Sequence, residues 1–219
     1  MPQLTFKGGQ PLCGTVVASG AKNAALPLLA ATLMMDGETI LRNVPQLEDI
    51  RIMLRMLTSL GVVAELQDNM AIRISNTKKI KHIAPYELVT AMRASFFVAG
   101  PILAKTGYAK ISLPGGCLIG KRPVDIHLDG FKALGATITL ENGFVGLKVR
   151  HLQGTRIRFP FPSVGATENI MMAACLATGE TIIENAAQEP EIKDLADLLN
   201  KAGGKITGAG TSTIQIQGV

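Results

Sequence analysis

A short glycine-led motif recurs three times along the chain, and this repeat constrains the fold more than any other feature. The motif occupies residues 37–40, 107–111 and 179–182, so its glycine advances by 70 residues and then by 72. A supersecondary unit repeated at a fixed interval determines the architecture before any single element is assigned. The sequence therefore predicts three structurally equivalent units.

A second marker supports the same division. An apolar residue followed by glycine recurs with steps of 74 and 68 residues, a pattern typical of a helix that ends on a left-handed glycine. We place the units at about residues 21–76, 85–150 and 160–218. The glycine pairs of the second marker are residues 60–61, 134–135 and 202–203.

Each unit opens with an apolar, alanine-rich segment of helical length. The three segments, at residues 24–35, 92–104 and 166–178, have almost no polar face. A helix that is apolar on all sides must be buried on all sides. We therefore expect three helices at the centre of the domain, with the other elements outside them.

The remaining elements of each unit fit this outer position. Residues 50–60 and 192–202 have the apolar stripe of amphipathic helices, and alternating stretches predict strands, with a hairpin turn at 208–210. The predicted fold class is α/β, an inside-out barrel of three repeats with buried central helices and outer sheets. The predicted strands are residues 39–41, 71–75, 136–140, 145–149 and 213–217.

Residues 1–20 lie outside the repeat. Residues 4–6 and 15–17 are typical of one or two strands, and we interpret this segment as part of a second domain that is absent from the chain.

Composition limits the class of protein. The 219 residues are 47% hydrophobic and 18% charged, which supports a substantial core. The longest uncharged apolar stretches, 23–35 and 94–104, are shorter than the roughly 20 residues that span a bilayer. No secretory signal opens the sequence, and three widely spaced cysteines fit neither a disulfide framework nor a zinc site. We expect a cytoplasmic protein without a metal.

The net charge of +5 favours an anionic partner, either nucleic acid, a membrane surface or a phosphorylated metabolite. The densest basic run, Lys78, Lys79 and Lys81, has no aromatic neighbours for base stacking and is interpreted as a solvated face.

Two of the predicted central helices begin with residues suited to anions. Lys22 and Asn23 open the first, where Asn23 is a candidate N-cap beside a basic side chain; Ser163 and Gly165 open the third. Arg93 begins the second, where a permanent charge needs an anionic partner. The alternatives are an ordinary cap with a solvated lysine, and a surface arginine paired with Glu87.

A further candidate site is the glycine-rich loop at residues 113–125. Cys117 stands at its tip, close in sequence to Lys121 and Arg122, which favour a reactive thiolate. The alternative is an incidental cysteine. Cys175 lies in an apolar helix and is interpreted as inert packing, and Cys13 is uninformative.

Together these motifs resemble the UDP-N-acetylglucosamine 1-carboxyvinyltransferase family along the whole chain. They are residues 19–23, the loop ending at Cys117, residues 122–127, 163–167 and 184–191. The resemblance implies two domains of three repeats each, with the active site between them. The implied reaction adds the sugar 3'-hydroxyl to C2 of phosphoenolpyruvate and then releases phosphate.

The resemblance also assigns roles to individual residues. Cys117 is the proton donor to C3, and a positive site stabilises the phosphate and carboxylate charges. It implies no cofactor, no metal, no nucleic acid and no membrane. The implied partners are UDP-N-acetylglucosamine, phosphoenolpyruvate and the carboxy-terminal half of the same enzyme. Phosphoenolpyruvate-side contacts are Lys22, Asn23, Arg93 and Arg122, of which Arg122 also faces the nucleotide. The uridine pocket is lined by Pro123, Val124, Asp125 and Ile126, and diphosphate contacts are Ser163, Val164 and Gly165.

The implied setting is the first committed step of peptidoglycan precursor synthesis in the cytoplasm. It serves cell-wall biogenesis, cell shape and division, and the enzyme is the target of fosfomycin. Phe161 departs from the family, because some members have lysine there, so we expect fewer diphosphate contacts. The second domain is expected to supply an aspartate base and a further arginine, so the chain alone is expected to be inactive. Alternative functions are the related transfer to shikimate 3-phosphate, and a non-catalytic module that binds UDP-sugar or nucleic acid.

Overall fold

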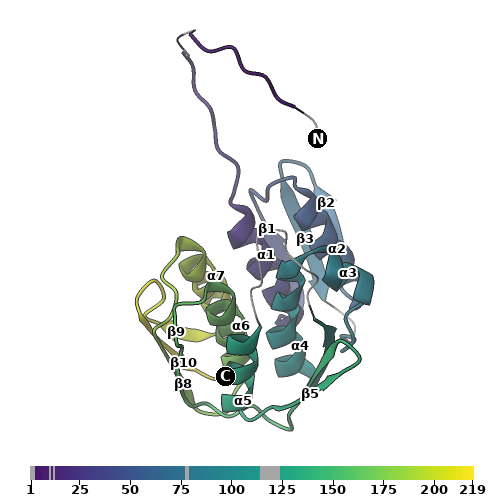
Figure 1. The fold of residues 1–219 in the computed structure, drawn as a ribbon, viewed down its shortest axis with the longest axis vertical. Helices are drawn as coiled ribbons and strands as arrows, with labels where there is room; N and C mark the ends of the chain where they lie inside the picture. Colours follow the sequence, from purple (N-terminus) through teal and green to yellow (C-terminus); the bar gives the residue numbers. More distant parts are fainter. Residues whose placement is uncertain (1–2, 10, 12, 77–78, 114–123) are drawn as a thin grey trace.

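Three helical segments form the centre of the domain, as the apolar runs predict. The computed structural model describes residues 3–9, 11, 13–76, 79–113 and 124–219. Figure 1 shows α4 and α6 side by side between the outer sheets, and they pack directly against each other. Nine consecutive residues of α6, Ala166–Ala174, are buried. The inside-out α/β arrangement is confirmed.

The first repeat contains one sheet and two helices. Its central helix α1 is followed by a single 3-10 turn, and its outer helix α2 buries the stripe that includes Ile50, Met53 and Leu57. The elements are α1 (Lys22–Ala31), η1 (Thr32–Met34), β1 (Gly37–Leu41), α2 (Glu48–Ser59), β2 (Val63–Gln67) and β3 (Ala71–Asn76).

The second repeat differs from prediction in its central segment. Residues 92–104 were expected to form one helix, but Met92 is extended and Arg93–Val98 forms a 3-10 helix before α4 begins. A short helix, α3, was not predicted. The elements are α3 (Tyr86–Ala91), η2 (Arg93–Val98), α4 (Ala99–Thr106), β4 (Tyr108–Ser112), α5 (Asp125–Ala133), β5 (Thr137–Glu141) and β6 (Phe144–Lys148).

The third repeat adds a strand. Thr213–Gln217 has the bounds predicted, and it forms the expected hairpin with the preceding strand. The extra strand β7 was not predicted, and it pairs in parallel with β8. The elements are β7 (Arg156–Arg158), α6 (Val164–Ala174), β8 (Glu180–Glu184), α7 (Pro190–Lys201), β9 (Lys205–Thr207) and β10 (Thr213–Gln217).

The three sheets share one topology. In each repeat, the last strand lies between the other two and pairs antiparallel with both, giving the orders β1-β3-β2, β4-β6-β5 and β8-β10-β9, with β7 added beside β8. The marker glycines Gly61, Gly135 and Gly203 have φ of 107°, 96° and 103°, so they adopt the left-handed conformation expected after a helix. The backbone therefore confirms the repeat inferred from sequence.

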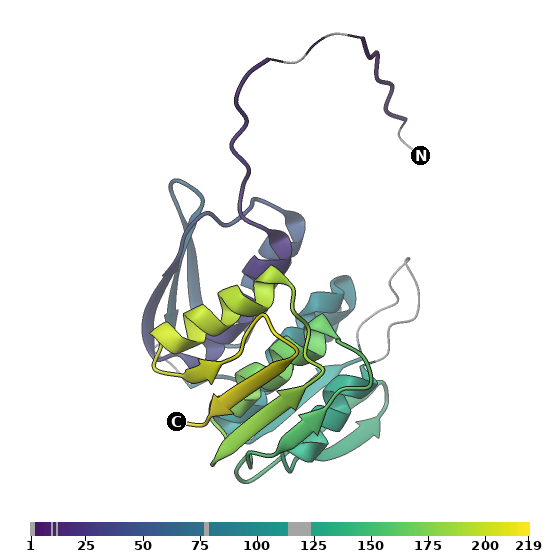
Figure 2. The ribbon, with the colours of Figure 1, turned by 90° about the vertical axis from the view of Figure 1, so that its left-hand side faces the viewer.

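The amino-terminal segment does not form the strands predicted for it. The described residues between 3 and 20 form no helix or strand, and Figures 1 and 2 show the segment extending away from the domain. A strand needs a neighbour to pair with, and no described residue of the domain pairs with this segment as a strand. Its large apolar side chains are therefore exposed: Leu4, Phe6, Val16 and Val17.

None of the helices in the described part of the chain combines the length and the apolar character needed to cross a membrane.

Candidate active site

The predicted site residues that the structure describes stand at the beginnings of four helices. Lys22 and Asn23 begin α1, Arg93 begins η2, Val124 to Ile126 begin α5, and Ser163 to Gly165 begin α6. Cys117, Arg122 and Pro123 lie outside the described residues. The first backbone amides of a helix have no partner within it, so helix starts are natural positions for anions.

The start of α1 is held by a close backbone approach. A Cβ atom at Gly20 would lie 2.0 Å from the carbonyl oxygen of Asn43, so only glycine fits there. The chain is still extended at Ala21 and becomes helical at Lys22. The Lys22 ammonium is partly exposed and lies 2.8 Å from Asp49 Oδ2, which leaves it accessible to a competing anion.

Asn23 is not the N-cap that we expected. Ala21 takes that position, and Asn23 lies in the first turn with an exposed side chain. The prediction failed because the extended backbone ends two residues earlier than the capping preference of asparagine indicates.

The start of α6 is a capped, half-buried turn. Ser163 is the N-cap, and its Oγ accepts a hydrogen bond from the Ala166 amide at 3.4 Å. Its carbonyl accepts from the Thr167 hydroxyl at 2.8 Å, and that hydroxyl in turn accepts from the Ala187 amide at 3.1 Å. This network fixes the turn and leaves the amides of Val164 and Gly165 without helical partners.

We expect Ser163→Ala to lower the free energy of unfolding by about 1 kcal/mol, because the Ala166 amide loses its cap. Urea unfolding followed by circular dichroism measures the change. Ser163→Thr keeps the hydroxyl and serves as the matched control. An alanine variant as stable as the threonine variant would contradict the capping role.

Arg93 and the start of α5 adjoin this turn. Arg93 is half-buried. Burial, and after it the charge of Arg93, lowers the pKa of His127, a buried residue of α5. His127 lies against Gly165, where a Cβ would be 3.3 Å from the ring carbon Cε1. The structure therefore places His127 of α5 against Gly165 of α6, with the charge of Arg93 near enough to affect the ring.

The predicted uridine contacts differ in exposure. Asp125 is exposed and Ile126 is half-buried, but the side chain of Val124 is buried in the core. Phe161, where some family members have lysine, is exposed beside the start of α6. Among the described residues, no hydrogen bond or ion pair links Lys22 or Asn23 to the Ser163 turn.

Sequence reasoning missed three residues of α6. Glu168 and Asn169 are buried polar side chains, and Thr167 takes part in the cap network. His127 was quoted in a motif but given no role. The signal was present, because three consecutive polar residues interrupt an otherwise apolar helix, and such residues need partners when buried.

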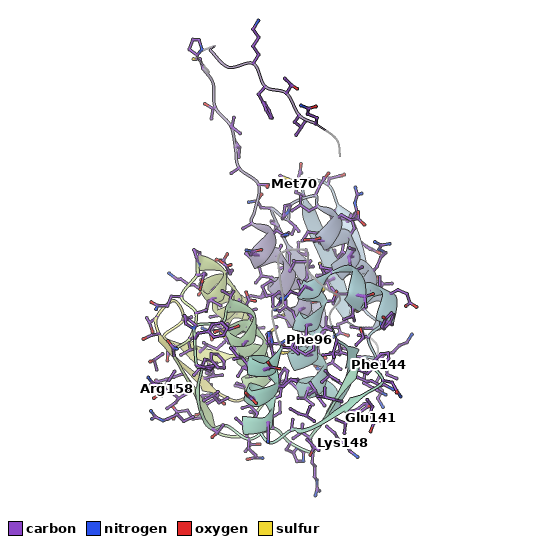
Figure 3. The ribbon with its side chains drawn as sticks, in the orientation of Figure 1. Met70, Phe96, Glu141, Phe144, Lys148 and Arg158 are labelled. Atoms are coloured by element: carbon purple, nitrogen blue, oxygen red, sulfur yellow. The ribbon has the colours of Figure 1, made fainter. Side chains whose placement is uncertain are left out.

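Asn169 explains the break between η2 and α4. Its Oδ1 accepts from the Gly100 amide at 2.7 Å, and its Nδ2 donates to the Phe96 carbonyl at 2.9 Å. An uninterrupted α-helix would join these same two backbone groups directly. The carboxamide of Asn169 stands between them, so the two inner segments are linked by buried hydrogen bonds as well as by packing. Figure 3 shows Phe96 at the centre of the domain, whereas Glu141, Phe144, Lys148 and Arg158 lie at its periphery.

A cavity of about 510 Å³ lies at the other end of α4, between Leu103–Tyr108 and Lys148–Leu152. None of the predicted site residues that the structure describes lines it. Among the described residues, no cluster of three or more His, Cys, Asp or Glu side chains is arranged to hold a metal ion.

The chain is similar to known proteins along nearly all of its length. The family model described as EPSP synthase (3-phosphoshikimate 1-carboxyvinyltransferase) matches residues 6–219. UDP-N-acetylglucosamine 1-carboxyvinyltransferase 1 of Caldanaerobacter subterraneus subsp. tengcongensis is 57% identical over 95% of this chain and 50% of its own length. The Geobacter metallireducens UDP-N-acetylglucosamine 1-carboxyvinyltransferase is 53% identical over 100% of this chain and 52% of its own.

Solved structures show the same fold at low identity. The enolpyruvyl transferase NikO from Streptomyces tendae superposes with a TM-score of 0.84 at 20% identity, covering 97% of this chain and 50% of that protein. An EPSP synthase from Acinetobacter baumannii gives a TM-score of 0.74 at 21% identity, covering 94% and 47%. The chain thus spans about half the length of the relatives that it matches. Because one family model spans nearly all of the chain and the fold agrees, this chain belongs to the EPSP synthase family.

Proposed function

We propose that this chain is the half of an enolpyruvyl transferase that takes UDP-N-acetylglucosamine and phosphoenolpyruvate as substrates. The observation that carries the proposal is the identity of 49–57%, over 95–100% of the chain, with relatives named UDP-N-acetylglucosamine 1-carboxyvinyltransferase. The solved structures at 20–21% identity support only the fold, so they do not favour transfer to shikimate 3-phosphate. The role in cytoplasmic peptidoglycan synthesis, and with it cell-wall formation, shape and division, belongs to the same proposal.

The proposed chemistry is an addition followed by an elimination. The sugar 3'-hydroxyl gives its proton to the aspartate base of the second domain, and its oxygen bonds to C2 of phosphoenolpyruvate while Cys117 gives a proton to C3, forming a tetrahedral intermediate. A proton then leaves C3 and the C2–O bond to phosphate breaks, which gives the enol ether and inorganic phosphate. Lys22, Asn23, Arg93 and Arg122 stabilise charge on phosphate and carboxylate, which is commonly the largest contribution to such catalysis.

The binding roles follow the helix starts. The free amides of Val164 and Gly165, with the Ser163 turn, suit the diphosphate of the nucleotide sugar. Residues 123–126 line the uridine pocket in this proposal, with Asp125 exposed at the first turn of α5. The buried side chain of Val124 supports a contact through backbone rather than side chain at that position.

A second domain completes the site. We propose that it is the carboxy-terminal half of the same enzyme, with the aspartate base and a further arginine. The exposed apolar side chains of Leu4, Phe6, Val16 and Val17 support the view that residues 1–20 pack against that half. Positioning two reactants between two faces contributes several kcal/mol to catalysis, so one face alone is expected to be inactive.

Phosphate release from the two substrates tests the proposal. We expect no turnover by the 219-residue chain alone, and turnover when a separately expressed carboxy-terminal half is added. The complete enzyme is the positive control, and shikimate 3-phosphate replaces the nucleotide sugar as the substrate control. Robust turnover by this chain alone would refute the two-domain reading, and a preference for shikimate 3-phosphate would refute the substrate.

The proton-donor assignment has its own test. We expect fosfomycin to alkylate Cys117 in the complete enzyme, and peptide mass mapping locates the adduct. Cys175 is the internal control, because burial raises the pKa of its thiol to about 12 and keeps it protonated. An adduct on Cys13 or Cys175 with Cys117 unmodified would show that the assignment is wrong.

If the protein instead binds nucleic acid, its affinity for an oligonucleotide should fall steeply with added salt and should not change when UDP-sugar is added. Titration of an oligonucleotide at two salt concentrations, with and without UDP-N-acetylglucosamine, separates the two functions.

A further inference from the structure

The carboxamide of Asn169 has only one possible orientation. Its Oδ1 accepts from a backbone N–H, that of Gly100, and its Nδ2 donates to a backbone carbonyl, that of Phe96. Exchanging the oxygen and nitrogen would place donor against donor and acceptor against acceptor. The second Nδ2 hydrogen is therefore available for another acceptor.

That acceptor is His127. Nδ2 of Asn169 lies 3.2 Å from Nδ1 of His127, and because an amide nitrogen only donates, Nδ1 must carry no proton. Burial, with the nearby charge of Arg93, lowers the pKa of His127 to about 4, so the ring is neutral at physiological pH. A neutral ring that lacks a proton on Nδ1 carries it on Nε2.

The ring is also fixed in place. Phe96 meets it edge to face with centroids 5.2 Å apart and planes at 90°. On the side of Nε2 lies Gly165, where a Cβ would stand 3.5 Å from Nε2 and 3.3 Å from Cε1. The Nε2–H edge therefore adjoins the second residue of α6, whose amide is one of the unpartnered donors at this helix start.

We propose that Asn169 is a positioning residue that holds His127 as a neutral Nε2–H donor to a diphosphate oxygen bound at the start of α6. The ligand class in this inference rests on the proposed function. A neutral donor contributes a hydrogen bond whose strength does not change as pH moves through the physiological range, because the ring titrates well below it. His127 therefore adds no charge to the site in that range.

Nuclear magnetic resonance of the ring nitrogens tests the positioning without any ligand. We expect His127 to show one neutral tautomer, protonated on Nε2, from pH 5.5 to 8. In Asn169→Asp, a carboxylate faces Nδ1, so the proton should move to Nδ1 and the pKa of His127 should rise. A wild-type ring protonated on Nδ1, or charged at pH 7, overturns the inference.

A matched pair of His127 variants tests the contact with the ligand. The amide nitrogen of glutamine reaches about as far as Nε2, whereas that of asparagine reaches only as far as Nδ1. We expect His127→Gln to retain most of the calorimetric affinity of the complete enzyme for UDP-N-acetylglucosamine and for UDP. We expect His127→Asn to lose about 10-fold or more, as for a hydrogen bond to a charged group.

The outcomes separate the inference from the proposed function. If both His127 variants bind as tightly as wild type, the inference is overturned while the proposed function stands. If wild type binds neither ligand, the proposed function fails and the ligand part of the inference fails with it, whatever the tautomer. The Asn169→Asp variant is not needed for the comparison of His127→Gln with His127→Asn. If Asn169→Asp does not fold, that comparison and the tautomer of the wild-type ring still test the inference.

Discussion

Gly100→Ala should lower the free energy of unfolding by about 2 to 3 kcal/mol, a large effect for the addition of one methyl group. Gly100 is the second residue of α4 and lies where this helix meets α6. The new Cβ would stand 2.4 Å from the backbone oxygen of Asn169 and 2.6 Å from its Oδ1. The backbone oxygen of Asn169 cannot move away from the new methyl group by a change of rotamer. The helices α4 and α6 must therefore separate, and the buried hydrogen bond from the Gly100 amide lengthens.

Gly130→Ala is the matched control for this prediction. Gly130 is also a buried glycine inside a helix, but its new Cβ would meet only the side-chain atoms Cδ1 and Cγ1 of Ile170, at 2.5 and 2.6 Å. That side chain can change rotamer, and alanine favours the helix by about 1 kcal/mol over glycine. We therefore expect a change within about 1 kcal/mol in urea unfolding. Equal losses at the two sites would show that clash with backbone is not the cause.

Glu168→Gln should remove most of the loss of stability that we expect as pH rises from 4.5 to about 9. Glu168 is buried in α6, and neither of its carboxyl oxygens has a hydrogen-bond partner among the described residues. Burial, reinforced by the charges of Glu191 and Glu189, raises the pKa of its carboxyl from 4.5 to about 9. The folded chain therefore keeps this proton in a pH range where the unfolded chain has released it.

The sign of the effect follows from proton counting. Between pH 4.5 and about 9 the folded state binds one more proton than the unfolded state, so stability falls as pH rises, by about 1.4 kcal/mol per unit. Below this range both states are protonated, and above it both are ionised, so the dependence disappears at each end. Glutamine does not titrate, so the variant has no such pH dependence, and its only cost is a buried amide without a hydrogen-bond partner. At pH 8 we expect Glu168→Gln to be more stable than wild type by about 2 kcal/mol or more.

The measurement is the difference in unfolding free energy between wild type and Glu168→Gln from pH 5 to 9. Glu180→Gln, at an exposed carboxylate of β8, should leave the pH dependence unchanged. Glu191→Gln should shift the upper end of the range to lower pH, because it removes one repelling charge. A difference between wild type and Glu168→Gln that does not vary with pH would show that Glu168 is ionised in the folded chain.

The repeat and the central helices could be predicted from sequence because their signals are local and strong. Apolar runs without a polar face identified the segments that pack at the centre, and alternation gave β10 its bounds. The separation of η2 from α4 could not be predicted, because its cause is Asn169, a residue 73 positions away from Phe96 along the chain. Strand β7 was missed since three residues are too short to show alternation.

The candidate site was predicted unevenly for a similar reason. Ser163 was identified as a helix start from its own sequence context, and the structure confirms its cap. Asn23 was misplaced by two residues, because cap preference does not determine where an extended segment ends. The roles of His127 and Asn169 depend on contacts between different helices, and sequence spacing does not reveal a contact between α5 and α6.

The sheets have a consequence for how the chain assembles. Every strand ladder in the described residues joins strands of the same repeat, so no sheet depends on segments distant in sequence. Each sheet can form early and independently, whereas the repeats are joined mainly by apolar packing of the inner helices. Circular permutation that opens the chain between repeats, near residues 150–155, would therefore interrupt no ladder of named strands. Such a permutant should fold to the same domain and lose cooperativity between repeats before it loses its sheets.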